Sequence, residues 1–272
     1  MNKKAVALVT GASSGMGKEI AKHLLADGYI VYGSARRVEK MRDLEEKGAN
    51  IIRMDITKEE DVANVVNTIQ EQNEGVDILI NNAGFATYGA VEDTTIDDAR
   101  YQFEVNLFGL AGITKAVLPY MREQKRGKIA NISSMGGKIY TPLGAWYHAT
   151  KHALEAWSDC LRFEVSPFGI DVIIIEPGII ETEFADVMVD PMMERSGNTA
   201  YSELAEKIKA ATLDSYKDGS PASEVAETVL KAVKAGKPKT RYAVGKMAKT
   251  FIFFRWLLGD RMFDRIVRNS ID

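Results

Sequence analysis

Short apolar runs alternate along the chain with longer segments in which apolar residues recur every three or four positions. The apolar runs predict strands at about residues 5–10, 29–34, 49–53, 76–80, 128–132, 170–175 and 240–244. The periodic segments predict helices near residues 15–27, 38–47, 58–73, 96–124, 147–166 and 221–235. Most strand runs are apolar throughout, which is typical of parallel strands covered on both faces. The pattern therefore predicts an α/β fold with one doubly wound, seven-stranded parallel sheet between helices.

A glycine-rich turn follows the first predicted strand. After Thr10 come Gly11, Ser13, Ser14, Gly15, Met16 and Gly17, and a helical pattern begins among them. Glycines let the backbone approach a phosphate closely, and the first N–H groups of a helix carry partial positive charge. Such a turn can be only a tight connection, but the strand before it and the helix after it favour a phosphate site.

Polar side chains follow two further predicted strands. The run at 76–80 leads into Asn81, Asn82, Ala83 and Gly84, and the run at 128–132 leads into Ser133 and Ser134. Open α/β sheets bind ligands at the carboxyl ends of their strands. The first segment can also be an ordinary Asn-rich turn, but its position makes it a candidate part of the same site.

Tyr147 and Lys151 lie four residues apart, so a helix places the phenol and the ammonium group on one face. A nearby cation favours the phenolate and is expected to lower the pKa of Tyr147, which would let its hydroxyl exchange a proton near neutral pH. This spacing also arises by chance on many helices. The pair is evidence for a proton-transfer site only in combination with the other segments.

These segments together resemble the short-chain dehydrogenase/reductase family over about residues 4–244. The matching motifs stand in the family's order and spacing: Thr10-Gly11-x-x-x-Gly15-x-Gly17, Asn81-Asn82-Ala83-Gly84, Asn106, Ser134, Tyr147-x-x-x-Lys151 and Pro177-Gly178. The resemblance implies a Rossmann-type domain that binds a nicotinamide cofactor and transfers a hydride between it and a carbonyl or alcohol carbon.

The resemblance also implies a catalytic group of Ser134, Tyr147, Lys151 and Asn106. Tyr147 would exchange the proton, and Ser134, rather than its neighbour Ser133, would hydrogen-bond the substrate oxygen. Lys151 would in addition bind the nicotinamide ribose. Asn106 would help to hold a water-linked proton path.

Further cofactor positions are implied by the same resemblance. Asp55, followed by Ile56, matches a position beside the adenine, although an Asp after a strand can also be a cap. Pro177 and Gly178 match the segment beside the nicotinamide. Thr182 matches a position that can bond the carboxamide.

The end of the second predicted strand indicates which nicotinamide cofactor binds. An NAD site usually places a carboxylate there to hold the ribose hydroxyls, but this chain has Ala35 followed by Arg36 and Arg37. Guanidinium groups suit a 2′-phosphate. The segment therefore predicts NADP(H), with Arg36 favoured over Arg37 for the contact; both arginines can instead be solvated at a helix start.

Substrate selection is assigned to residues 179–211, which we expect to form a loop. The segment is rich in apolar side chains: Phe184, Val187, Met188, Val189, Met192 and Met193. They suit a pocket for a hydrophobic carbonyl or alcohol, such as a steroid, a retinoid or a long-chain carbonyl compound. They suit a buried lid over a small polar substrate equally well.

A C-terminal extension, residues 245–272, continues past the last predicted strand, as is more common in steroid and retinol dehydrogenases of the family. Its apolar stretch 251–258 is flanked by Lys and Arg and is too short and too charged to span a bilayer. We expect a helix pair packed on the substrate segment or on a subunit partner. An interfacial helix in weak, peripheral contact with anionic lipid is the alternative.

Composition adds limits on function. The 272 residues, 46% of them hydrophobic, suffice for a single domain over residues 1–272. A formal net charge of −3 with scattered Lys and Arg argues against nucleic acid as a partner. The single cysteine, Cys160, is expected in the core, and three dispersed histidines make a metal site unlikely. No apolar leader segment follows Met1, so we expect a cytoplasmic protein.

Three functional classes remain open. The first is an NADP(H)-dependent oxidoreductase acting on a small-molecule carbonyl or alcohol, as a homo-oligomer (dimer or tetramer) by resemblance. The second is an acyl-thioester (3-oxoacyl) reductase, which needs a basic surface for an acidic carrier. The third is a non-catalytic NADP(H) sensor, which the presence of Ser134, Tyr147 and Lys151 disfavours.

Overall fold

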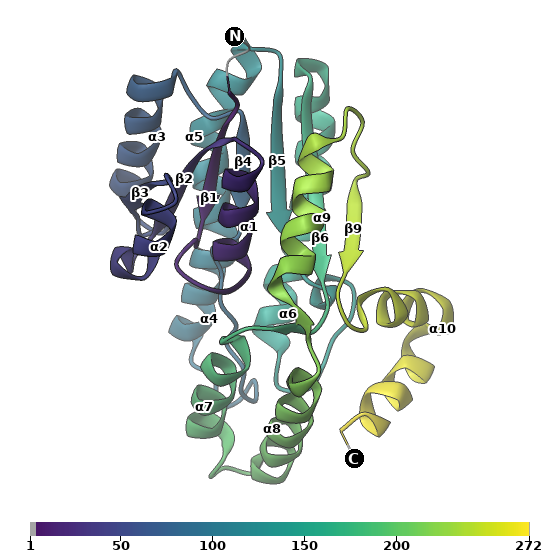
Figure 1. The fold of residues 1–272 in the computed structure, drawn as a ribbon. Helices are drawn as coiled ribbons and strands as arrows, with labels where there is room; N and C mark the ends of the chain where they lie inside the picture. Colours follow the sequence, from purple (N-terminus) through teal and green to yellow (C-terminus); the bar gives the residue numbers. More distant parts are fainter. Residues whose placement is uncertain (1–3, 272) are drawn as a thin grey trace.

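A seven-stranded parallel sheet runs through the protein, and the computed structural model describes residues 4–271 (Figure 1). Its strand order is β3-β2-β1-β4-β5-β6-β9. The strands are β1 Val6–Thr10, β2 Ile30–Ala35, β3 Asn50–Arg53, β4 Ile78–Asn81, β5 Gly127–Ile132, β6 Ile170–Pro177 and β9 Arg241–Val244. The predicted α/β doubly wound fold is confirmed.

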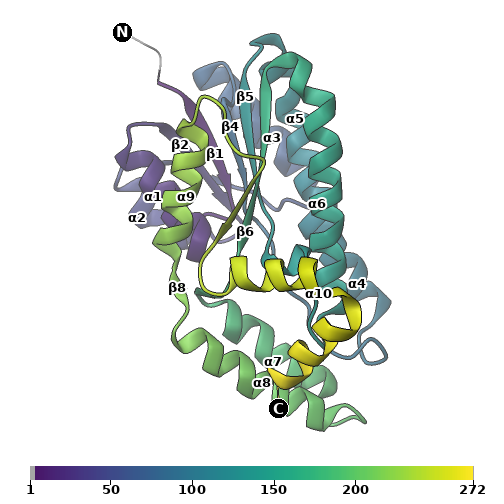
Figure 2. The same cartoon turned by 90° about the vertical axis from the view of Figure 1, so that its right-hand side faces the viewer.

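Helices cover both faces of the sheet, as Figure 2 shows. The helices of the central fold are α1 Gly15–Ala26, α2 Arg42–Glu45, α3 Glu59–Asn73, α4 Ile96–Phe103, α5 Leu110–Glu123, α6 Ala145–Val165 and α9 Ala222–Lys234. Short 3₁₀ turns occupy η1 Val38–Met41, η3 Met135–Gly137 and η4 Ser166–Phe168.

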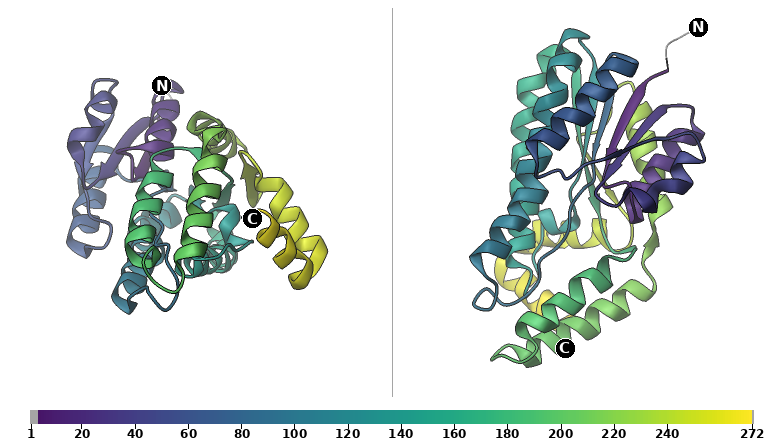
Figure 3. Two further views of the ribbon diagram at one scale, coloured as in Figure 1. Left: turned by 90° about the horizontal axis from the view of Figure 1, so that it is seen from below. Right: turned by 90° about the vertical axis from the view of Figure 1, so that its left-hand side faces the viewer.

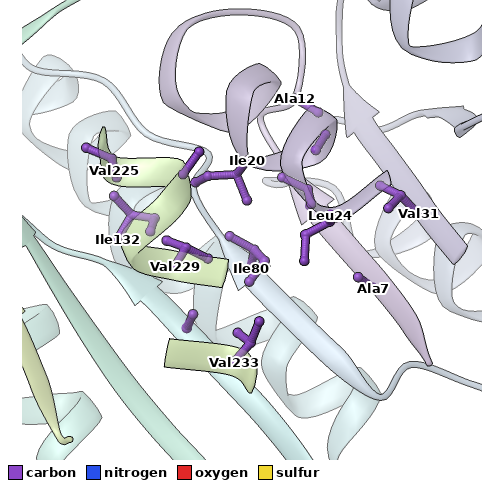
Figure 4. Packing of buried hydrophobic residues seen from close by; sticks show 14 of the residues in the cluster. Ala7, Ala12, Ile20, Leu24, Val31, Ile80, Ile132, Val225, Val229 and Val233 are labelled. Atoms are coloured by element: carbon purple, nitrogen blue, oxygen red, sulfur yellow. The ribbon is translucent and has the colours of Figure 1, made fainter. Parts of the chain in front are cut away.

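Alternation along β1 explains the two layers. Ala7 and Val9 point to one face and pack in the cluster that includes α1 and α9 (Figure 4), whereas Val6 and Leu8 point to the other face, covered by α3, α5 and α6. All four residues are fully buried. Each buried aliphatic side chain contributes about 1.5–3 kcal/mol of hydrophobic stabilisation, so the two clusters hold the carboxyl ends of the strands in fixed positions.

The long helix predicted at 96–124 is interrupted. A π-helical turn, η2 Glu104–Gly109, separates α4 from α5 and contains the buried Asn106. Such turns are rare and occur often at functional sites. Gly109 packs closely on Ile56, which follows β3, and an added Cβ would sit 2.7 Å from the Ile56 carbonyl oxygen. The sequence pattern alone does not reveal this one-residue shift in helical register.

The substrate segment is helical, and our prediction of a loop over 179–211 is wrong. It forms β7 Ile180–Glu181, α7 Phe184–Ser196 and α8 Ser202–Lys217, and β7 pairs with the short β8 Ser220–Pro221. Figure 3 shows α7 and α8 side by side. Met188, Val189 and Met192 follow a helical spacing and are buried among residues of α8 and the segment after β4. Pro191 inside α7 hides that period in the sequence.

The C-terminal extension forms a single long element, α10 Ala248–Asn269, broken at Gly259, whose φ of 66° and ψ of 178° are not helical. The result is the expected helix pair. Its inner side packs on η3 and the residues after it, where Phe263 and Val267 are buried with Ile139. Among residues 4–271, no helix combines the length and apolar character that crossing a bilayer requires.

Cys160 is exposed on α6, so the prediction that it is a core thiol is wrong. The neighbouring Leu161 faces the core instead. A single cysteine in an amphipathic helix cannot be assigned to a face from its chemistry alone.

Candidate active site

Two cavities adjoin at the carboxyl edge of the sheet. The first, about 360 Å³, lies beside the switch in strand order between β1 and β4, the place where open α/β sheets bind ligands. Its wall includes these predicted cofactor residues: Gly11, Ser13, Ser14, Gly15, Met16, Arg36, Arg37, Asp55, Ile56, Asn82, Ala83, Gly84 and Thr182. Gly17, Lys151, Pro177 and Gly178 lie outside this wall; Pro177, Gly178 and Tyr147 line the second cavity.

Contacts from Asn82 and Ala83, which follow β4, fix the conformation of the glycine turn. The Asn82 Nδ2 donates to the carbonyl oxygens of Thr10 and Gly11 at 3.0 and 3.2 Å, and the Thr10 hydroxyl accepts from the backbone N–H groups of Asn82 and Ala83. Gly17 is required by this packing, because a Cβ there would sit 2.3 Å from the Asn82 Nδ2. Asn82 therefore braces the turn, a role that the sequence motif does not specify.

The start of α1 fits a diphosphate. Ser14 is its N-cap but makes no side-chain cap hydrogen bond, and its first turn contains no acidic residue. The first N–H groups of a helix lack partners within the helix and favour anions. Gly11 and Gly15 have φ values of +68° and +50°, a backbone conformation that glycine adopts without the strain that a side chain would cause.

The opposite end of this cavity carries both arginines. Arg36 and Arg37 are exposed, and the Arg36 Nη1 donates to the Tyr101 hydroxyl at 3.0 Å. Partial burial raises the pKa of Asp55, but hydrogen bonds from the Thr57 hydroxyl and N–H, together with the charge of Arg36, outweigh it and leave this pKa below its usual range. Asp55 thus makes the local contacts of a cap, which was the alternative to a cofactor contact, and it also lines the cavity.

The predicted catalytic side chains come from three elements. Ser134 follows β5, Tyr147 and Lys151 lie on α6, and Asn106 lies in η2. Ser134 hydrogen-bonds the Tyr147 side chain and accepts from the Gly136 N–H at 3.0 Å. The Lys151 Nζ donates to the Ile132 carbonyl oxygen at 2.9 Å and lies 6.0 Å from the Tyr147 ring centroid.

Asn106 lies behind this group and is fully engaged with protein atoms. Its Nδ2 donates to the Phe85 carbonyl oxygen at 2.9 Å and to the Thr150 hydroxyl at 3.2 Å, and its Oδ1 accepts from the Phe85 N–H at 3.1 Å. Thr150 sits between Tyr147 and Lys151 on α6. Asn106 therefore joins the segment after β4 to α6.

Burial, not the neighbouring cation, controls the acidity of Tyr147. Burial raises the pKa of Tyr147 well above its usual value, the hydrogen bond with Ser134 opposes this only in part, and Tyr88 adds to the rise. The expected lowering by Lys151 is wrong, since the Lys151 Nζ is held at Ile132. Burial also lowers the pKa of Lys151 to about 8, against an opposing effect of Glu155. At neutral pH Tyr147 is a neutral phenol, the form that donates a proton.

The second cavity, about 240 Å³, is predominantly apolar. Tyr88, Met188, Ile208 and Phe251 are among the residues that line it, and no Asp, Glu, Lys or Arg of the described chain does. Met16, Thr182 and Phe184 line both cavities, so the two spaces meet beside Tyr147. One wall is made by α10 through Phe251, Phe263 and Val267, together with Ser270 and Ile271, which follow the helix.

Comparison with known proteins agrees with this geometry. A family profile described as short chain dehydrogenase matches residues 5–192. The chain belongs to the short-chain dehydrogenase family. The crystal structure of a short-chain dehydrogenase from Streptomyces avermitilis superposes with a TM-score of 0.81 at 34% identity, covering 98% of this chain and 95% of that one.

Two curated relatives of this dehydrogenase are named as reductases. An NADPH-dependent 3-dehydrocapnine reductase from Ornithobacterium rhinotracheale is 35% identical over 273 residues, 96% of this chain and 95% of the relative. A 3-ketodihydrosphingosine reductase from Bacteroides thetaiotaomicron is 42% identical over 185 residues, 66% of each chain. The dehydrogenase is thus an oxidoreductase with close reductase relatives.

Several residues of the dehydrogenase's site were not predicted from sequence. His148 is neutral, because burial lowers its pKa to about 4, and it braces the segment that follows Ser134. Its Nδ1 lies 2.9 Å from the Gly136 carbonyl oxygen and its Nε2 accepts from the Thr141 N–H at 3.0 Å. Tyr216, from α8, stacks on Phe184, which in turn contacts the Tyr147 ring. The sequence pattern predicted no helix over α8 and gave no signal for Tyr216.

Proposed function

We propose that this dehydrogenase is an NADP(H)-dependent carbonyl reductase for a hydrophobic substrate. The observation that carries the proposal is the position of Tyr147 and Ser134 in the wall of an apolar cavity that meets the first cavity, which the glycine turn and both arginines line. A proton donor at the junction of the two spaces suits reduction of a carbonyl group held there.

The cofactor assignment is supported by the residues of the first cavity. The uncapped start of α1 would hold the diphosphate, and Arg36 would hold the 2′-phosphate. Position 35 is an alanine, so no carboxylate there would repel this phosphate. Thr182 would bond the carboxamide, and Lys151 the nicotinamide ribose. When bound, the nicotinamide supplies or accepts the hydride. The name of the NADPH-dependent relative also favours this cofactor.

The chain itself orients the carbonyl and moves the proton. Ser134 hydrogen-bonds the carbonyl oxygen, and Tyr147 donates its phenolic proton to that oxygen as negative charge develops there. In the reverse direction Tyr147 accepts the proton. Lys151 provides positive charge beside the site, and Asn106 fixes the position of α6 through Thr150.

The cavity favours an uncharged, apolar substrate portion around the carbonyl. Ionised groups lose hydration in such a space, and no ionised side chain of its lining compensates them. A steroid, a retinoid or a long-chain carbonyl compound fits this requirement better than a small polar carbonyl. The two named reductase relatives support carbonyl reduction as the direction.

The experiment is a measurement of NADPH consumption by the purified protein with steroid, retinoid, aliphatic and acyl-thioester carbonyl compounds, alongside separate measurements of NADPH and NADH binding. Turnover of a hydrophobic ketone with NADPH supports the proposal. Turnover confined to acyl thioesters identifies the alternative reductase. Tight NADPH binding with no turnover on any compound leaves two explanations, a sensor or a substrate outside the tested compounds.

We also propose that the protein is a homo-oligomer that associates through the outer surface of η2, α5 and α6. Phe108 and Phe163 are 56% and 75% exposed there, although they are large apolar residues. Their burial in a subunit contact would remove this surface from water. Sedimentation analysis of Phe163→Ser should then show a smaller assembly than the unmodified protein.

A further inference from the structure

α10 has two different sides. Its inner side carries Phe251, Phe263 and Val267, which line the second cavity. Its outer side faces away from the rest of the molecule. Figure 2 shows the helix crossing the lower end of the fold, and Figure 1 shows it on the side of α8 that is away from α7. The apolar residues of the inner side are explained by their place in the cavity wall. The residues of the outer side need a separate explanation.

The first limb of α10 exposes an aromatic surface. Phe253, Trp256 and Leu257 are 52%, 76% and 54% exposed. Their spacing of three and four residues places them on one side of the helix, and the Phe253 and Trp256 rings lie 6.1 Å apart. Monomeric soluble proteins rarely expose large contiguous apolar surfaces without a function.

The outer side of α10 is also positively charged. Lys249 lies four residues before Phe253, and Arg261, Arg265 and Arg268 follow a helical spacing on the second limb. All four are exposed, and none forms an ion pair with any residue of 4–271. They are therefore available to an anionic partner.

The two acidic residues of α10 offset these cations only in part. Asp260 pairs with the partly buried Arg255 at 2.7 Å, and Asp264 accepts a hydrogen bond from the Tyr140 hydroxyl at 2.7 Å. The Arg255 guanidinium in turn lies over the rings of Tyr140 and Phe263. These contacts hold the helix against η3 and leave positive charge outward, in a chain whose formal net charge is −3.

We propose that the outer side of α10 binds the surface of an anionic lipid bilayer. A row of aromatic side chains next to unpaired Lys and Arg is the combination that inserts at the headgroup level of anionic membranes. A second copy of the chain is a poorer occupant, because a symmetric contact would bring the same cations together. An acidic carrier protein would match the cations but not the exposed Trp256 and Phe253.

The placement of α10 gives this contact a role, and that role rests on the proposed function. The helix is about 10 Å thick with its side chains, and its inner residues line the cavity beside Tyr147. A membrane on the outer side therefore lies one helix away from the substrate site. A hydrophobic carbonyl compound dissolved in the bilayer reaches the cavity with little exposure to water.

Co-sedimentation with vesicles tests the proposal. The unmodified protein is mixed with vesicles of phosphatidylcholine alone and of phosphatidylcholine with an equal amount of phosphatidylglycerol, at low and physiological salt. We expect stronger binding to the anionic vesicles, weakened by salt. F253S/W256S and R261E/R265E/R268E should each reduce partition at least about tenfold.

Matched variants separate this result from general effects of charge or hydrophobicity. K231E/K237E/K239E reverses three exposed cations at the other end of the sheet, and V91S/I96S removes two exposed aliphatic residues. Both should bind vesicles like the unmodified protein, and NADPH binding reports that each variant is folded. Absence of vesicle binding, equal loss in the control variants, or loss of a dimer in F253S/W256S would overturn the proposal. Because no substrate is used, such failure leaves the proposed reductase activity intact.

Discussion

The two cavities of the candidate site, which we propose to be its cofactor half and its substrate half, differ in how the chain builds them. In the cofactor half, the turns after β1, β2 and β4 place backbone groups and short side chains, and each turn depends on a few neighbouring residues such as Gly17 and Asn82. In the substrate half, α7, α8 and α10 line a cavity with apolar side chains, and other apolar residues could line it equally well. Sequence motifs therefore describe the first half well and the second half poorly.

Tyr147→Phe tests the point where the halves meet and should have the largest effect. The change removes the phenolic proton and leaves the ring, so turnover of a carbonyl substrate should fall on the order of 10²-fold or more. NADPH affinity should change little, since Tyr147 lines the second cavity and not the first. Steady-state kinetics and fluorescence titration of NADPH measure the two quantities.

Tyr88→Phe is the matched control for this loss. Tyr88 lines the same cavity, and its ring centroid lies 5.9 Å from that of Tyr147. If the removal of either hydroxyl lowered turnover equally, Tyr147 would not be the specific proton donor.

Arg36→Ala tests the cofactor half alone. It should weaken NADPH binding by about 10- to 100-fold, in line with the loss of a charge-assisted hydrogen bond, and NADH binding by much less. Arg37→Ala, one residue away and equally exposed, should have a smaller effect on NADPH. Equal weakening of NADPH and NADH by Arg36→Ala would show that the guanidinium does not contact the 2′-phosphate.

The contrast between the halves explains what could be predicted from the sequence. The strands were predicted because parallel strands buried on both faces form continuous apolar runs, as Ile78, Leu79 and Ile80 of β4 illustrate. The glycine turn was predicted because Gly11 and Gly15 adopt positive φ, which few other residues tolerate. These are local properties of the chain.

The features that were missed depend on contacts between distant segments. The helical state of α7 depends on burial of Met188 and Met192 against α8, which a methionine-rich sequence with an internal proline does not indicate. The raised pKa of Tyr147 depends on enclosure by Tyr88 and other residues outside α6, so the spacing to Lys151 alone gave the wrong sign. The π-helical turn at Asn106 likewise follows from packing around Ile56 and Phe85.

Tyr216→Ala tests the substrate half alone. Tyr216 stacks on Phe184 in the cavity wall, so its truncation should raise KM for a hydrophobic substrate about tenfold and leave NADPH affinity unchanged. Leu213→Ala, on the same helix but outside the lining, is the control and should change neither quantity. A parallel loss of NADPH affinity in Tyr216→Ala would mean that the two halves are not separable.

Lys151→Met tests the energetic penalty of burying a cation close to Tyr147. Burial lowers the pKa of Lys151 from 10.5 to about 8, so between these values the unfolded chain binds more protons than the folded protein. The free energy of unfolding therefore rises with pH across this window. Below about pH 8 the buried charge of Lys151 lowers this free energy by its full amount, at most about 3 kcal/mol. The variant lacks the titrating group, so the free energy of unfolding of the unmodified protein should increase relative to that of Lys151→Met between about pH 7 and pH 10. Urea unfolding at each pH measures this difference. A constant difference would mean that the Ile132 carbonyl and Glu155 compensate the buried charge completely, and that Lys151 is held in its position near Tyr147 without a cost in stability.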